Sequence, residues 1–132
     1  MKYLQDYVND KQTKALDKAD AFFAFSTKQY NEATKEGIKY ANLGGGLICN
    51  ELKAEVLKEE LDIIYKDSIK EDIKENGITR IIKRELNNYE AGYTGEIDST
   101  VDALGDYPVT VRQILKVFRS KEYREEYFQD NY

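Results

Sequence analysis

One expected helix, over residues 50–76, carries a regular series of acidic side chains. Glu55, Glu59 and Asp62 follow one another at steps of four and three residues, with Glu51 four residues before them. On a helix such residues lie on one face, so these carboxylates would form a continuous acidic ridge. A ridge of this kind could imitate the charge of a nucleic-acid backbone and occupy a basic groove on a partner protein. The interspersed lysines are equally typical of an ordinary solvated helix face.

A second group of polar side chains has the spacing of a DNA-reading helix. Arg112, Lys116 and Arg119 recur at steps of four and three residues, with Gln113 beside them, and the segment 98–110 would supply a first helix and a turn. In a helix-turn-helix protein, Arg and Gln contact base edges and Lys contacts phosphates. A basic face on an acidic protein is also typical of a protein-docking surface. A small DNA-binding regulator is therefore the alternative hypothesis.

Three consecutive glycines, Gly44 to Gly46, could cradle a phosphate with their backbone N–H groups. However, neither the Lys-Ser or Lys-Thr pair of a phosphate loop nor the spacing of a dinucleotide-binding loop is present. A tight turn between two strands is the simpler interpretation. Nucleotide binding at this turn remains a further alternative.

Several classes of catalytic and metal site are excluded by composition. The chain has no histidine and one cysteine, Cys49, which rules out Ser–His–Asp and Cys–His triads and zinc sites built on Cys and His. Asp98, Asp102 and Asp106 could hold a hard cation, but they lack the pattern of a calcium loop. A carboxylate site for magnesium or calcium and carboxylate acid/base chemistry remain open alternatives, and our prediction is no enzymatic activity, no metal and no cofactor.

The totals indicate a small cytoplasmic protein. The net charge of −5 in 132 residues disfavours broad binding to nucleic acid. A lone cysteine is typical of a reducing compartment, where we expect Cys49 to act as a small buried hydrophobe. No segment approaches the ~18 apolar residues of a membrane-spanning helix, and we expect no signal peptide and no membrane contact.

The elements expected to position these residues give a helix-dominated α+β fold in a single domain, 1–132, with 121–132 frayed. A long central helix over 50–76 should pack against flanking helices and a small antiparallel sheet, since its apolar residues recur at helical spacing. The expected helices are 3–19, 26–35, 50–76, 79–91, 98–104 and 110–120, the expected strands are 22–25, 38–43 and 47–49, and 92–95 is expected as a turn. Ser26 and Thr110 begin capping-box patterns at two helix starts, and Gly77 is well placed to end the long helix.

Three apolar sets should form the core. The segment 22–25 is expected as a buried strand. The apolar stripe of the long helix comprises Leu57, Leu61, Ile64, Tyr65, Ile69 and Ile73. The buried sides of the two later helices comprise Ile81, Ile82, Leu86 and Tyr89, and Val111, Ile114, Leu115 and Phe118.

Several strings resemble a family of small proteins from bacteriophages and mobile elements that has no established activity. They are 21–26 (AFFAFS), 29–30, 37–49 (GIKYANLGGGLIC), 76–78, 84–90 (RELNNYE), Thr94 and 101–104. The resemblance spans about residues 20 to 118. The family often has His where this chain has Tyr89, so the resemblance implies no His-dependent role here.

Together these observations favour a non-enzymatic binding protein of phage or mobile-element origin. The resemblance implies a stoichiometric inhibitor of a host defence protein, in the manner of an anti-CRISPR protein, acting in the host cytoplasm. The partner would be a host protein, such as a nucleic-acid-processing one, bound through Glu55, Glu59 and Asp62. Eleven tyrosines, several of them near the C-terminus, are compatible with an interface. We expect a monomer or a homodimer.

Overall fold

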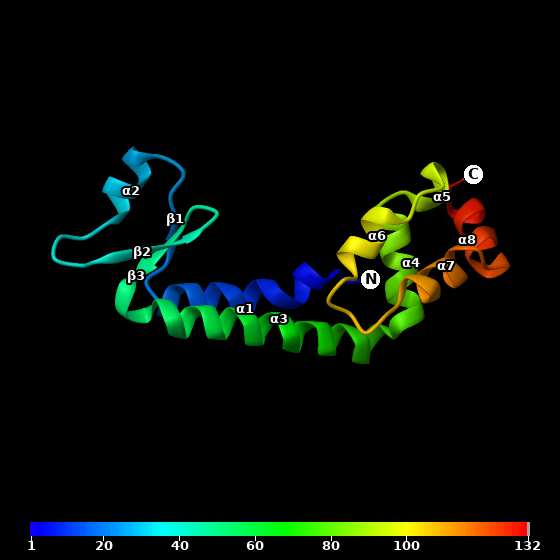
Figure 1. Cartoon of the computed structure of the whole chain (residues 1–132), viewed down its shortest axis with the longest axis horizontal. Coiled ribbons are helices and arrows are strands. Elements are labelled where there is room, and N and C mark those ends of the chain that lie inside the picture. Colours follow the sequence, from blue (N-terminus) through cyan, green and yellow to red (C-terminus); the bar gives the residue numbers. More distant parts are fainter. Residues whose placement is uncertain (132) are drawn as a thin grey trace. The chain divides into compact units, whose positions relative to one another are not determined.

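The computed structural model describes residues 1–131, with side chains through 129. It confirms a helix-dominated α+β fold (Figure 1). The contacts between residues cluster into two compact units, Met1–Ser68 (unit 1) and Ile69–Tyr132 (unit 2). The long helix α3, Ala54–Asn76, begins in unit 1 and ends in unit 2, and a short 3₁₀ turn, η1 (Glu51–Lys53), precedes it. The single-domain organisation stays a prediction.

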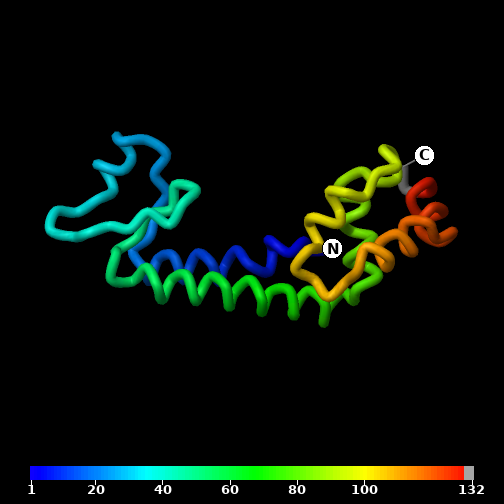
Figure 2. Tube along the Cα trace, in the orientation of Figure 1, coloured from blue at the N-terminus to red at the C-terminus, as the bar shows by residue number. Residues whose placement is uncertain are grey.

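Unit 1 contains a pair of antiparallel helices, α1 (Leu4–Lys18) and the first part of α3 (Figure 2). Lys18 Nζ lies 3.1 Å from Glu60 Oε1 at one end of the pair, and Ser68 Oγ donates to the Tyr7 carbonyl (3.4 Å) at the other. The side chains buried between the helices and the sheet are mostly small: Ala15, Ala19, Cys49, Ala54 and Leu57. Cys49 is fully buried as expected, and burial raises the pKa of its thiol.

A small antiparallel sheet completes unit 1. Its strands β1 (Phe22–Phe23), β3 (Leu47–Asn50) and β2 (Tyr40–Gly44) lie in that order. Helix α2, Thr27–Ala33, follows β1, and the Ser26 hydroxyl accepts a hydrogen bond from Gln29 N (3.2 Å) as its N-terminal cap. The expected strands and the capped helix are therefore confirmed, with β1 shorter than expected.

The glycine triplet lies at the turn of the β2–β3 hairpin, as expected: Gly44 ends β2, and Gly45 and Gly46 form the turn. Gly46 has φ +82°, and a Cβ atom placed there would lie only 2.5 Å from the ring of Phe25. A side chain at this position would therefore meet both backbone strain and the aromatic ring. A strand follows the turn instead of a helix, so no helix dipole stands behind these N–H groups to attract a phosphate.

Unit 2 is a cluster of helices around α4, Ile78–Asn88. Helices α5 (Ala91–Thr94), α6 (Asp98–Ala103) and α7 (Val111–Phe118) contact α4, and α8 (Lys121–Asn131) contacts α7. Its buried apolar side chains are Ile69, Ile81, Ile82, Leu86, Ala91, Leu104, Tyr107, Ile114 and Tyr123.

Three expectations about burial are wrong. The segment 22–25 is not a buried strand, because Phe23 and Phe25 are 52% and 74% exposed and stack on each other outside the sheet. Tyr89 is exposed because it lies at the C-terminal cap of α4, beyond the last turn that packs inward. Val111 is exposed because it is the first residue of α7, where the helix has just begun.

The segments around 92–95 and after 120 also differ from the simplest expectation. A one-turn helix, α5, occupies most of the expected turn. The segment expected to fray contains α8, and its Tyr123 is buried, with the hydroxyl donating to Asn87 Oδ1 (3.1 Å). Tyr132, which belongs to the predicted C-terminal tyrosine group, lies outside the described residues.

Candidate protein-binding surface

The acidic residues singled out in the sequence lie on the solvent side of α3, within unit 1. Glu55, Glu59 and Asp62 are all exposed. Two of them are paired within the helix: Glu55 with Lys58 (3.4 Å) and Asp62 with Lys66 (2.8 Å). The hydrogen bond to Asp62 raises the pKa of Lys66. Exposed pairs of this kind contribute little to stability, so a partner could replace them at small cost.

Apolar side chains that the sequence analysis missed lie beside the acidic ridge. Leu52, Val56 and Ile63 are 92%, 57% and 57% exposed. Leu52 lies in η1, just before α3, and Val56 and Ile63 follow it at steps of four and seven residues, which places Val56 and Ile63 on one side of α3. We call the six side chains of the line and the ridge the acidic–apolar face: Leu52, Val56, Ile63, Glu55, Glu59 and Asp62. The signal in the sequence was an apolar repeat out of phase with the core stripe that begins at Leu57.

A groove adjoins this face between α1 and α3. It has a volume of about 360 Å³, and apolar atoms make up most of its lining. Ala15 of α1, Ala19 at the C-terminal cap of α1 and Val56 of α3 are among its lining residues. Because alanine side chains are short, they leave room for another segment to approach both helices. Charges stand at the rim, where Lys18 pairs with Glu60 (3.1 Å).

The second end of the rim is also charge-balanced. Lys53 Nζ donates to Asp20 Oδ2 (2.7 Å) and to the Lys18 carbonyl (3.2 Å). The charged partner holds the pKa of Asp20 below its usual value, through a hydrogen bond and then through its charge. Paired charges thus stand on both sides of the apolar line, and the acidic ridge has one carboxylate more than its paired lysines, Lys58 and Lys66.

The basic residues of the DNA-binding alternative lie on α7 in unit 2. Arg112, Lys116, Arg119 and Gln113 are all exposed, as that alternative requires. However, Gln113 Oε1 accepts a hydrogen bond from Thr110 N (2.7 Å), and Gln113 N donates to Thr110 Oγ1 (3.2 Å). This capping box was expected from the sequence, and it occupies the amide oxygen that a bidentate contact to adenine would use.

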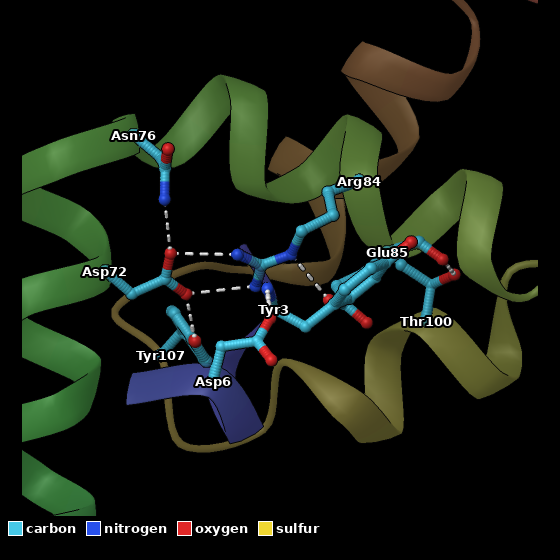
Figure 3. A network of polar contacts seen from close by, with 8 residues as sticks. All are labelled: Tyr3, Asp6, Asp72, Asn76, Arg84, Glu85, Thr100 and Tyr107. Carbon is cyan, nitrogen blue, oxygen red and sulfur yellow. Dashed lines mark hydrogen bonds and ion pairs between the residues drawn. The ribbon is translucent and has the colours of Figure 1, made fainter. Parts of the chain in front are cut away.

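A buried charged network, also missed by the sequence analysis, lies in unit 2 (Figure 3). Arg84 donates from Nη1 to Asp72 Oδ1 (2.8 Å), from Nη2 to Asp72 Oδ2 (3.0 Å) and from Nε to Glu85 Oε1 (2.8 Å). Tyr107 Oη and Asn76 Nδ2 also donate to the carboxylate of Asp72. Within the described part of the chain, no buried side-chain polar atom lacks a partner. The network is therefore satisfied internally.

The protonation states in this network are set by its own members. Burial alone would raise the pKa of Asp72, but the hydrogen bonds from Arg84, Tyr107 and Asn76 outweigh it and lower the pKa. Burial and the bond to Asp72 raise the pKa of Tyr107. Asp72 is therefore ionised and Tyr107 neutral at pH 7, which suits a structural pair better than proton transfer.

Other chemistry finds little support in the described part of the chain. No three acidic or cysteine side chains there lie close enough together to hold a metal ion, and Asp98, Asp102 and Asp106 are no exception. Over the same residues, no helix has the length and apolar character needed to cross a membrane. The absence of a metal, a cofactor and an enzymatic activity stays a prediction.

The chain belongs to a family of unknown function, DUF7659, whose model matches residues 4–129. No curated protein and no solved structure matches it. Membership of a family without an assigned function agrees with the resemblance noted from the sequence. The phage or mobile-element origin attached to that resemblance stays a prediction.

Proposed function

We propose that this chain is a non-enzymatic binding protein that docks a partner protein on the acidic–apolar face of α3. The observation that carries the proposal is the line of exposed apolar side chains, Leu52, Val56 and Ile63, beside an acidic ridge. Exposed apolar patches bordered by charge are typical of protein interaction sites. An ordinary solvated helix face would not expose apolar side chains at regular helical spacing.

The partner we propose is a protein with a basic and apolar surface. Our first candidate is a nucleic-acid-processing defence protein of a bacterial host, which this chain would inhibit stoichiometrically. The support for this candidate is the charge of the ridge, which is complementary to a groove that normally binds nucleic acid. The resemblance to proteins of phages and mobile elements points to the same class of partner.

The experiment is a pull-down with the tagged full-length chain from host lysate, with and without nuclease treatment. The wild-type chain is compared with the triple variant Glu55→Lys, Glu59→Lys, Asp62→Lys. The matched control is Asp10→Lys, Asp17→Lys, Glu75→Lys, which reverses the same number of exposed carboxylates elsewhere. Melting temperatures of all three proteins establish that they fold equally well.

We expect one stoichiometric partner that survives nuclease treatment, is retained by the control variant and is lost from the triple variant. If the triple variant still retains the partner protein, the acidic ridge takes no part in binding it. If recovery vanishes with nuclease, the basic face of α7 becomes the candidate site. In that case the variant Arg112→Ala should lose DNA retention at low salt, because phosphate contacts dominate such binding.

A further inference from the structure

We propose that the segment received by the acidic–apolar face is an amphipathic helix with a basic side, contributed by the partner protein. This inference rests on the proposed function and adds the shape and chemistry of what is bound. Helix-in-groove recognition uses apolar anchors at helical spacing that seat in an apolar groove. Three properties of the face lead to this assignment: its length, its groove and the distribution of its charges.

The length of the apolar line suits one short helix. Leu52 and Ile63 are eleven residues apart, which along a helix corresponds to roughly 16 Å. A bound helix of about three turns covers that distance and can present apolar side chains at steps of three and four residues along it. An extended strand would instead need free backbone groups to pair with, and a helix surface offers none.

The groove beside the line accepts the apolar side of such a helix. Helices pack at interaxial distances of roughly 8–10 Å, and small side chains at the contact favour the closer approach. Ala15 of α1 and Ala19 at its C-terminal cap line the groove together with Val56 of α3. Because both alanines are only 5% exposed, a third helix lying here would cover mainly the apolar surface of Leu52 and Val56.

The charges around the groove specify which side of the bound helix is basic. On the groove side of the apolar line, Lys18 is paired with Glu60 and Lys53 with Asp20, so this rim is nearly neutral. On the other side, the three carboxylates of the acidic ridge face two paired lysines, Lys58 and Lys66, so one negative charge remains in excess. A bound helix would therefore place its Lys or Arg residues along one edge only, facing the ridge.

A second copy of this chain is a less suitable occupant. Helix α7 has the required basic residues at steps of four and three, Arg112, Lys116 and Arg119. However, among the described residues of α7, Val111 alone is a large apolar side chain that is exposed. The solvent side of α7 therefore offers a single apolar anchor. Self-association through α7 would leave most of the apolar line uncovered, and the experiment below includes it as an outcome.

The test uses the full-length chain and a synthetic helix of ~18 residues, about five turns, with leucines on one side and lysines along one adjoining edge. Two control peptides accompany it. One has the same composition in scrambled order, and the other has glutamate in place of every lysine. Binding is measured by fluorescence anisotropy and by calorimetry, and the chain alone is examined by analytical ultracentrifugation.

We expect one-to-one binding of the lysine peptide and at least about tenfold weaker binding of the scrambled peptide. Val56→Asp should weaken the binding of the lysine peptide by about tenfold or more, because the substitution places a charge in the apolar line. The matched control is Val111→Asp, a comparably exposed valine outside the face, which should change nothing. The triple variant with lysine at positions 55, 59 and 62 should lose the lysine peptide and gain the glutamate peptide.

Three results would overturn the inference. If the scrambled peptide binds equally well, the binding is unspecific charge attraction and does not depend on an amphipathic helix. If Val56→Asp binds the lysine peptide as tightly as the wild type, the apolar line takes no part in the interaction. A chain that already forms a dimer, dissociated by reversing Arg112, Lys116 and Arg119, would make α7 of a second copy the occupant.

These results can be told apart from failure of the proposed function. If the lysate partner is captured through Glu55, Glu59 and Asp62 while no helical peptide binds, only the helical nature of the bound segment is wrong. If neither the peptide nor the lysate partner depends on these residues, both the inference and the proposed function fail.

Discussion

The two units bury different kinds of side chain. Unit 1 closes around alanines, Cys49 and Leu57, and leaves Leu52 and Phe25 largely in solvent. Unit 2 buries larger aliphatic and aromatic side chains together with an ionised network around Asp72 and Arg84. Both units expose large apolar side chains, Val111 and Phe128 in unit 2 among them, whereas the buried charged side chains among the described residues, Asp72, Arg84 and Glu85, all lie in unit 2. Only unit 2 therefore depends on buried charges for its stability.

Removing one member of the buried network should affect stability differently from removing one member of a surface pair in unit 1. A buried pair with all its hydrogen bonds made is costly to break, because removing one partner leaves an uncompensated charge in the interior. An exposed pair is solvated before and after the change. Helix α3 carries pairs of both kinds, which allows the two units to be compared on a single helix.

The largest effect is expected for Asp72→Ala. It removes the carboxylate that faces the Arg84 guanidinium and should lower the free energy of unfolding by about 3–5 kcal/mol. The matched control is Asp62→Ala, which removes an exposed carboxylate paired with Lys66 on the same helix and should change it by less than about 1 kcal/mol. Urea denaturation followed by far-ultraviolet circular dichroism measures both. Equal losses would contradict the contrast drawn between the units.

A smaller loss is expected for Tyr107→Phe. The variant keeps the ring but removes the hydroxyl that donates to Asp72. Hydrogen bonds to charged groups are worth about 1.5–3 kcal/mol, so the free energy of unfolding should fall by that amount in the same denaturation experiment. Tyr93→Phe alters a strongly exposed tyrosine of the same unit and serves as the control, with no measurable change. No loss for Tyr107→Phe would mean that Arg84 and Asn76 satisfy the carboxylate alone.

Next comes Gly92→Ala, which tests how tightly unit 2 is packed. A Cβ atom at Gly92 would lie 2.6 Å from the ring of Tyr127, which also contacts the rings of Tyr123 and Phe128. Overpacking against a ring held on both sides costs about 1–3 kcal/mol. In a double-mutant cycle, Tyr127→Ala should cancel most of the loss, as measured by thermal denaturation. Additive losses would indicate that the ring simply moves aside.

The smallest effect on the free energy of unfolding is expected when the pH is lowered. Asp72 has a folded-state pKa below its unfolded value of about 3.9, so its contribution to stability is present above that pH and is lost as the pH falls through the folded pKa. Because burial opposes the lowering, the net change is modest. The free energy of unfolding measured from pH 6 to pH 2 should therefore fall less steeply below about pH 4 in Asp72→Asn than in the wild type. Parallel curves would assign the acid sensitivity to other carboxylates.

Local signals account for the elements that the sequence predicted well. The caps at Ser26 and Thr110 predicted the starts of α2 and α7, because a side-chain oxygen and a backbone N–H three residues later suffice to define them. Gly77 predicted the end of α3, where its N–H donates to the Ile73 carbonyl (2.9 Å). Such contacts lie within a few residues of each other, and short stretches of sequence contain them completely.

Contacts between distant residues were not predictable in the same way. Asp72 and Arg84 have the residue types of a solvated surface, and only the packing of α4 against α3 brings them into the interior together. Tyr107 reaches the same carboxylate across 35 positions of the chain. The exposure of Phe25 is a further case, since aromatic composition predicts burial unless the strand that carries it is known to end at Phe23.

The candidate surface was half predictable. The acidic spacing of Glu55, Glu59 and Asp62 follows from the sequence alone, and all three residues are exposed. The importance of Val56 and Ile63 depends on which side of α3 faces α1, and the apolar repeat by itself is compatible with either side. Sequence therefore located the helix and its charges, whereas the structure was needed to separate the apolar residues of the core from those of the surface.

Cys49 offers a way to observe unit 1 by itself. Its thiol is fully buried in strand β3, and it is the chain's only cysteine. A thiol-specific reagent can react with it only when that strand opens, so the labelling rate under native conditions reports local opening of unit 1 and is silent about unit 2. A partner that binds between α1 and α3 should slow this labelling, because it would oppose local opening of unit 1. The labelling rate of the native Cys49 would then follow binding without an engineered cysteine.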